Sequence, residues 1–290
     1  MNNSYQIVPL RSYGSQFPWE GDCEKKPWDY EVTAVVPVLD SFDCIEICVE
    51  LLRNQTIKPF IVLIDTGSSE EQLEKICGLR DKDLEVHILR LNGVKHPSDF
   101  PAMAMDLAFS VCRSPYLFAT HLDCFLKKQD FIEHLLGLMD KSPVVGYEIT
   151  PRAHNDWKGM VSHTATMYHM PTMDEIGFGW SLRRLCNLYG IVDHKPNPLM
   201  PNWPDTEILG NVILRHHKIE PLLIGHEQNF KRYVDDNIDH CRSIVSARLY
   251  SPVYRSQAEK WLESAKEEAK ERIEKWKKEK NFKFNNQKYV

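Results

Sequence analysis

Between residues 31 and 139, short apolar segments alternate with segments whose apolar residues recur at helical spacing. The apolar segments are rich in valine and isoleucine, which is typical of strands that are buried on both faces of a sheet. This alternation predicts βαβ units, and therefore an α/β fold with a mostly parallel central sheet flanked by helices. The expected strands are 31–39, 59–65, 84–91 and 116–122, and the expected helices are 44–54, 69–79, 101–112 and 129–139.

The composition is that of a globular protein, because 42% of the 290 residues are hydrophobic and 27% are charged. The formal net charge of -5 gives no bulk attraction to nucleic acid or to an anionic membrane. The N-terminus lacks the apolar segment of a signal peptide, and no apolar run reaches the roughly 18 residues of a membrane span. The eight cysteines form no CxxC pair. We therefore expect free thiols and a cytoplasmic protein without a membrane span.

The second half of the chain is richer in proline, tryptophan, histidine and asparagine, and its strands are harder to place. Helical spacing predicts helices over 174–189, 205–217 and 256–280. Segment 164–169 is expected to be a strand, and the polar stretch 226–243 is expected to be a loop. The long C-terminal helix is charged, with two tryptophans on a sparse apolar face. It fits a solvated helix packed on the body, and the alternative is a contact surface for an oligomer or a membrane.

Polar residues follow three of the expected strands. Ligands of open parallel sheets bind beyond the carboxyl ends of the strands, so these residues are the first candidates for a site. Asp40 follows the first strand, and Asp65 ends the second. The carboxylate of Asp65 can accept hydrogen bonds from a base or a ribose, or it can serve only the following turn or helix start. The segment His121-Leu122-Asp123 ends the fourth strand.

His121 and Asp123 are two residues apart at a strand end, where their side chains would point the same way and reach one ion. Imidazole with carboxylate suits Mn²⁺, Zn²⁺ and other first-row ions better than Mg²⁺ alone. Taken alone, the pair fits a structural hydrogen-bonded pair better than a metal site. Its position at the tip of a parallel strand favours the metal site, where an ion would neutralise a diphosphate leaving group as a Lewis acid.

Two later segments hold further candidates. Asp205 and Glu207 begin an expected helix, where a carboxylate can deprotonate an acceptor hydroxyl or can simply cap the helix. His240 lies in the late polar stretch and is a candidate third metal ligand. Arg242 lies beside it and is a candidate for binding phosphate oxygens. The chain has 12 histidines, and any one of them is more often a surface or packing residue than a metal ligand.

These sequence features, the polar residues at the strand ends and the later polar segments, occur together in a known family. Residues 31–140 resemble the nucleotide-binding half of the GT-A glycosyltransferases, especially those of family 2. The stretch TAVVPVLDSFDCIEICVELLRNQTIKPFIVLIDTGSS is similar to the opening of that family. The resemblance implies the GT-A fold of nucleotide-diphospho-sugar transferases, and the helical spacing near the C-terminus adds a long helix that has no counterpart in the resemblance. It also implies that Pro37, Val38 and Asp40 line the nucleotide pocket and that Asp65 binds the base.

The segment PAMAMDLAFSVCRSPYLFATHLDCFL is similar to the helix of that family and the following strand, which ends in D-x-D. Asp106 stands where the family often has asparagine, and we include it among the donor-binding residues. His121 replaces the first aspartate of D-x-D, and Asp123 retains the last. This departure leaves the preferred ion open, and also whether a metal is needed.

The resemblance to the family is less specific in the second half of the chain. PDTE (204–207) occupies the place of an E-D type motif, which makes Asp205 the first candidate for the base and Glu207 the second. HCRS (240–243) is similar to a segment that closes over the diphosphate and can supply a ligand. By this resemblance we divide the chain into an N-terminal arm (1–29), a nucleotide-sugar-binding half (30–145), an acceptor-binding and catalytic half (146–250) and a C-terminal helical extension (251–290).

The function implied by the resemblance is an inverting transfer of a sugar from a nucleotide-diphosphate sugar to an acceptor hydroxyl, assisted by Mn²⁺ or Mg²⁺. The acceptor is open: a glycan, a small molecule, a protein or a nucleic-acid base. One alternative is an inactive protein that only binds a nucleotide sugar. The other is a nucleotidyltransferase, which ranks last because the segment PVLDSFD after the first strand has no glycine-rich phosphate loop.

Overall fold

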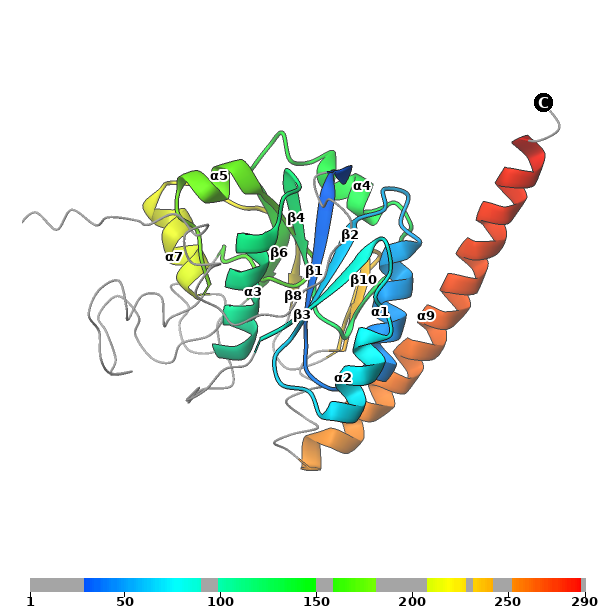
Figure 1. Cartoon of the computed structure of the whole chain (residues 1–290). Coiled ribbons are helices and arrows are strands. Elements are labelled where there is room, and N and C mark those ends of the chain that lie inside the picture. Colours follow the sequence, from blue (N-terminus) through cyan, green and yellow to red (C-terminus); the bar gives the residue numbers. More distant parts are fainter. Residues whose placement is uncertain are drawn as a thin grey trace, which may run out of the picture.

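The computed structural model of the protein describes residues 29–89, 99–149, 159–180, 208–227, 232–241 and 252–287. In these residues a seven-stranded sheet has the order β3-β2-β1-β4-β7-β6-β8, and a three-stranded sheet has the order β5-β10-β9. Strands β1 to β4 are mutually parallel where they pair, which confirms the mostly parallel sheet. Figure 1 shows the helices around this sheet. The first strands are β1 (Val32–Val38), β2 (Phe60–Asp65), β3 (Leu84–Ile88) and β4 (Tyr116–Ala119).

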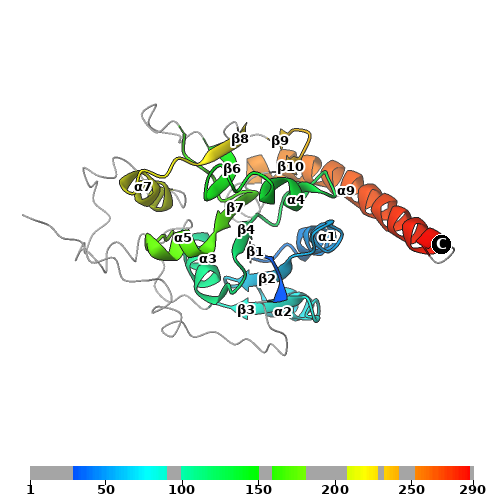
Figure 2. The same ribbon diagram turned by 90° about the horizontal axis from the view of Figure 1, so that it is seen from above.

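Helices cover both faces of the large sheet, as Figure 2 shows from above. Alternate side chains of β1 divide between two apolar clusters: Ala34 and Val36 belong to the cluster that includes α1, whereas Val35 belongs to the cluster that includes α3. This two-sided burial explains why the strand is apolar without alternation. Helices α1 (Phe42–Arg53), α2 (Glu70–Cys77) and α9 (Pro252–Gln287) lie on one face, and α3 (Asp99–Val111), α5 (Met170–Glu175) and α7 (Ile208–His216) lie on the other.

The second half contributes strands to the same sheet. β7 (Thr166–His169) lies antiparallel between β4 and β6 (Val144–Ile149), and β8 (Leu222–Glu227) lies parallel to β6. The expectation of a loop over 226–243 is wrong, because β8 ends in it and β9 (Tyr233–Val234) and β10 (Ile238–His240) lie within it. The helix expected over 174–189 is also wrong at its start, since α5 ends at Glu175 and 176–180 are not helical.

Strand β4 is shorter than expected. It ends at Ala119, and a turn at residues 122 and 123 leads into β5 (Cys124–Leu126), which pairs antiparallel with β10. Helix α4 (Phe131–Leu136) follows. The chain therefore leaves the large sheet just before His121 and enters the small sheet just after Asp123. This change of sheet places the segment between the two.

Helix α9 packs along α1 through small and apolar residues, and its C-terminal end extends away from the body (Figure 1). Ala265 and Ala269 are almost fully buried, and so are Ile273 and Trp276 farther along. Lys266 is held by Asp43 of α1 at 2.9 Å. The expected apolar face is confirmed at Ile273 and Trp276. Within the described residues, every helix is too short or too polar to cross a bilayer.

Candidate functional site

The turn after β4 is fixed by backbone hydrogen bonds. Cys124 donates its N–H to the carbonyl of His121 at 3.1 Å, and Cys241 donates to the carbonyl of Asp123 at 2.9 Å. In the β5–β10 ladder, His240 lies opposite Cys124. The register of the small sheet therefore brings His240, from far along the chain, beside the His121-Leu122-Asp123 segment.

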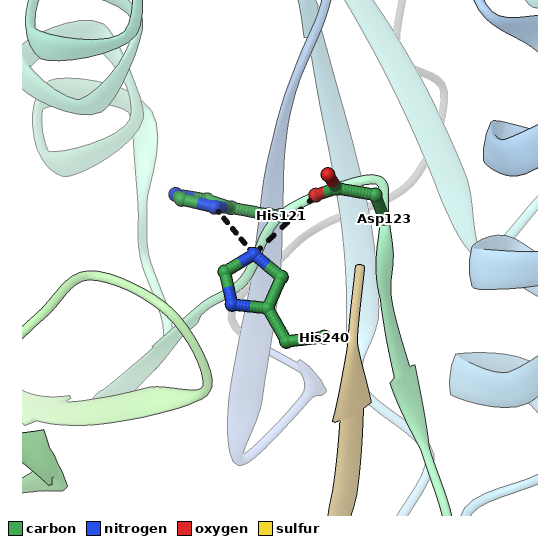
Figure 3. A group of neighbouring side chains, drawn as sticks. All are labelled: His121, Asp123 and His240. Atoms are coloured by element: carbon green, nitrogen blue, oxygen red, sulfur yellow. Dashed lines mark hydrogen bonds and ion pairs between the residues drawn. The ribbon is translucent and has the colours of Figure 1, made fainter. Parts of the chain in front are cut away.

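His121, Asp123 and His240 converge in one cluster, drawn in Figure 3. His121 Nδ1 lies 3.3 Å from His240 Nε2, and His240 Nε2 lies 3.5 Å from Asp123 Oδ1. One ligand atom from each residue lies within 4.8 Å of the others. Asp123 is 5% exposed and His240 2% exposed, while His121 is half-buried. The cluster is thus shielded from water on the side of the small sheet.

The geometry of the cluster fits a divalent ion. Two donors about 2.1 Å from one ion at near-tetrahedral angles lie about 3.4 Å apart, close to both separations in the cluster. Two imidazole nitrogens and one carboxylate oxygen are ligands of first-row ions such as Mn²⁺ or Zn²⁺. The reason given by the sequence pattern is wrong, however: His121 and Asp123 approach each other through a turn, and not through alternation along a strand.

A buried ion pair anchors strand β10 next to His240. Arg232 Nε donates to Asp239 Oδ1 at 2.8 Å, and its Nη2 donates to the other carboxylate oxygen. The side chain of Asp239 is 2% exposed and that of Arg232 is 19% exposed. The hydrogen bond to Asp239 is the main cause that raises the pKa of Arg232. This pair holds the residue directly before His240.

We expect Arg232→Met to lower the free energy of unfolding by about 3 kcal/mol, because it leaves the Asp239 carboxylate buried without its partner. The lower part of the usual range applies since Arg232 is partly exposed. Urea denaturation followed by circular dichroism measures the change. Arg255→Met on α9 is the matched control, because that side chain is exposed. Equal midpoints for the two variants would contradict a structural role of the pair.

Asp40 and Asp65 lie at the same edge of the sheet, after β1 and at the end of β2. Both oxygens of the fully buried Asp65 carboxylate accept backbone N–H groups, from Gly67 at 3.2 Å and from Ser68 at 3.1 Å. Asp40 Oδ1 accepts from the backbone and the hydroxyl of Ser69, at 2.9 and 3.1 Å. Both carboxylates therefore order the loop after β2. A carboxylate oxygen has a second lone pair, so binding of a donor by either residue stays a prediction.

The other donor-binding candidates occupy different surroundings. Pro37 is half-buried and Val38 is 1% exposed, with its carbonyl accepting the N–H of Thr66. Asp106 is 5% exposed on α3, and its Oδ1 accepts the backbone N–H of Trp180 at 2.7 Å. Contact of these residues with a nucleotide stays a prediction. Asp205, Glu207 and Arg242 lie outside the described residues.

Two residues that the sequence analysis did not single out as site residues also reach the cluster. His163 Nε2 faces His121 Nε2 at hydrogen-bond distance, and Thr164 Oγ1 lies 3.4 Å from His121 Nδ1. Both precede β7, which pairs antiparallel with β4. The sequence signal that could have found them is this pairing, because it sets the start of β7 beside the end of β4.

Two buried thiols, those of Cys48 and Cys241, lie near the cluster. Cys48 Sγ lies 3.8 Å from the carbonyl oxygen of His121, and burial, with a smaller effect of Asp123, raises the pKa of Cys48 to about 12. Burial also raises the pKa of Cys241. Such thiols stay protonated at neutral pH, and a thiol ligates a metal as thiolate. The imidazoles and the carboxylate are therefore the ready ligands here. The described cysteines are free thiols: Cys44, Cys48, Cys77, Cys112, Cys124 and Cys241.

The sheet and the cluster together define the class of protein. Parallel strands carry acidic residues after β1 and at the end of β2, and a cluster of potential metal ligands follows β4, in the GT-A fold of nucleotide-diphospho-sugar transferases. The model of glycosyl transferase family 2 matches residues 33–186, which is more than half of the chain. The chain belongs to this family and is a glycosyltransferase.

Solved structures with a similar chain path include the mannosyltransferase PcManGT of Pyrobaculum calidifontis, in complex with GDP-Man and Mn²⁺. It is 14% identical, with a TM-score of 0.48 and coverage of 92% of this chain and 79% of that one. TarS of S. aureus is 13% identical, with a TM-score of 0.46 and coverage of 80% and 69%. Glucosyl-3-phosphoglycerate synthase of Mycobacterium tuberculosis is 9% identical, with a TM-score of 0.44 and coverage of 80% and 79%. A search of curated proteins found no match.

Proposed function

We propose that the protein transfers a sugar from a nucleotide-diphosphate sugar to an acceptor hydroxyl, with a divalent ion held by His121, Asp123 and His240. The observation that carries the proposal is the convergence of two imidazoles and one carboxylate at the tip of β4, 3.3 and 3.5 Å apart. Membership of glycosyl transferase family 2 supplies the reaction class. When bound, the ion would supply Lewis-acid neutralisation of the charge on the departing diphosphate.

The remaining donor-binding residues lie mostly at the carboxyl ends of the strands. Asp65 binds the base, and Pro37, Val38, Asp40 and Asp106 shape the nucleotide pocket around it. Strand β1 lies between β2 and β4, so the donor would stretch across the ends of neighbouring strands. Arg242 binds the phosphate oxygens, a role assigned from the similarity of HCRS (240–243) to the family segment that closes over the diphosphate. An arginine presents several N–H donors in a planar fork that matches phosphate.

The acceptor half supplies the base. Asp205 removes the proton from the acceptor hydroxyl as that oxygen attacks the sugar carbon from the face opposite the diphosphate, and the configuration inverts. Glu207 is the second candidate for this role. A carboxylate serves here because it is ionised at neutral pH and can accept the proton in the transition state. Residues 146–250 form the acceptor side, and the acceptor is a glycan, a small molecule, a protein or a nucleic-acid base.

A panel of nucleotide sugars, each with Mn²⁺ and with a chelator, tests the proposal through thermal stability. We expect one donor to raise the melting temperature by several degrees with Mn²⁺, since a ligand at a hundred times its Kd adds about 2.7 kcal/mol. Release of the nucleotide diphosphate with that donor then measures turnover. If no donor stabilises the protein under either condition, donor binding is contradicted. A shift that a chelator leaves unchanged contradicts the metal.

A further inference from the structure

His163 lies directly behind the metal-ligand candidate His121. Its side chain is 3% exposed, and the two ring centroids are 4.2 Å apart at 61°. The contact joins the Nε2 atoms of the two rings. The two nitrogens of an imidazole point to opposite sides of the ring, and Nδ1 of His121 faces His240. His163 therefore touches the side of His121 that points away from the candidate ion.

The position of the proton on His121 follows from the proposed metal site. An ion bound by His121, Asp123 and His240 would take the lone pairs of His121 Nδ1 and His240 Nε2, the two ring nitrogens that lie 3.3 Å apart. A neutral His121 with its Nδ1 turned to the ion carries its proton on Nε2, the atom that faces His163.

We propose that His163 is a positioning residue, which accepts the Nε2–H of His121 and so keeps His121 Nδ1 free of a proton and aimed at Asp123 and His240. This inference rests on the metal site of the proposed function. A metal takes the lone pair of an unprotonated ring nitrogen, and the partner of the other nitrogen decides the tautomer. His163 must then present a bare Nε2 and carry its own proton on Nδ1.

His163 is itself held in place by a buried tryptophan. Its ring packs edge-on against Trp180, with centroids 5.4 Å apart, and Trp180 is fully buried. The backbone N–H of Trp180 donates to Asp106 of α3 at 2.7 Å. A line of contacts thus runs from α3 through Trp180 and His163 to His121. It limits rotation of the His163 ring away from its partner.

Three substitutions separate hydrogen bonding from packing. The amide oxygen of glutamine reaches the place of a histidine Nε2 and can accept, whereas asparagine reaches only as far as Nδ1. Phenylalanine fills the space and accepts nothing. We expect His163→Asn and His163→Phe to weaken Mn²⁺ binding by about 10- to 100-fold, and His163→Gln to stay near the wild-type affinity. Isothermal titration of the metal-free protein with Mn²⁺ measures this, and Co²⁺ absorption reports the ligand set.

His87→Phe is the matched control, because His87 is equally buried at 3% but lies in β3 beside Glu85. Its affinity for Mn²⁺ should stay at the wild-type value. Thermal melting in a chelator shows that each variant is folded, and the comparison of glutamine with asparagine holds even if the phenylalanine variant unfolds. Equal affinities of the Asn and Gln variants overturn the role of His163. If Mn²⁺ binds equally well to wild type and to Asp123→Asn, the metal site itself fails, and the inference with it.

Discussion

Asp123→Asn is expected to lower the rate of sugar transfer by about a hundred- to a thousandfold. The change keeps the size of the side chain but removes the only carboxylate of the His121–Asp123–His240 cluster. Loss of several kcal/mol of charge stabilisation in the transition state corresponds to a factor of this size, since each 1.36 kcal/mol is about tenfold. The initial rate of nucleotide-diphosphate release, at saturating donor and fixed Mn²⁺, is the measurement.

The matched control for this prediction is Asp130→Asn. Asp130 precedes α4, is exposed, and makes no side-chain hydrogen bond to the start of that helix. Its rate should equal that of the wild type. Raising Mn²⁺ should restore part of the rate of Asp123→Asn, because an amide oxygen is a weaker ligand and not an absent one. A wild-type rate in Asp123→Asn at low Mn²⁺ would exclude this carboxylate from the reaction.

Asp205→Asn is expected to reduce transfer by about 10²- to 10⁴-fold and to leave donor binding nearly unchanged. The amide cannot take the proton of the acceptor hydroxyl, whereas the proposed donor site lies at the ends of β1, β2 and β4. Two measurements are needed: kcat with a working acceptor, and the Kd of the donor by titration. The expected pattern is a fall in kcat at constant donor Kd.

Glu207→Gln is the comparison for the base, because both carboxylates lie in PDTE. A wild-type rate in Asp205→Asn with a large loss in Glu207→Gln would transfer the role of base to Glu207. A loss of donor affinity in Asp205→Asn would mean that the residue binds the donor. Both results are read directly from the same two measurements.

The first half of the fold could be predicted because its strands are buried on both faces. The segments VTAVVPV and FIVLID leave little choice of structure, and β1 and β2 begin within one residue of the expected positions. The expected ends of these strands also identified Asp40 and Asp65 as candidate site residues. Local sequence was sufficient here, because each strand buries both faces and is followed by a helix that covers it.

The strand expected over 164–169 is confirmed as β7, whereas β6 and β8 escaped prediction because their glycines weaken the apolar pattern. Gly146 in β6 lies so close to Thr166 of β7 that a Cβ would overlap it, and a Cβ at Gly225 in β8 would overlap the ring of Tyr147. Glycine is required by contacts between neighbouring strands, which the local sequence does not reveal. In the site, the resemblance singled out His240, whereas His163 depends on the pairing of β7 with β4. Tertiary pairing, and not spacing along the chain, brings these side chains together.

His121 and His240 are 119 positions apart in the chain, yet their nearest ring nitrogens are separated by 3.3 Å. An ion held by both would act as a noncovalent cross-link that closes this long loop. The cluster does not exist until β10 has paired in register with β5, so the ion can load only onto a chain whose two halves have assembled. Loading would then favour the folded state by mass action. The protein would then acquire its catalytic ion only when folding of both halves is complete.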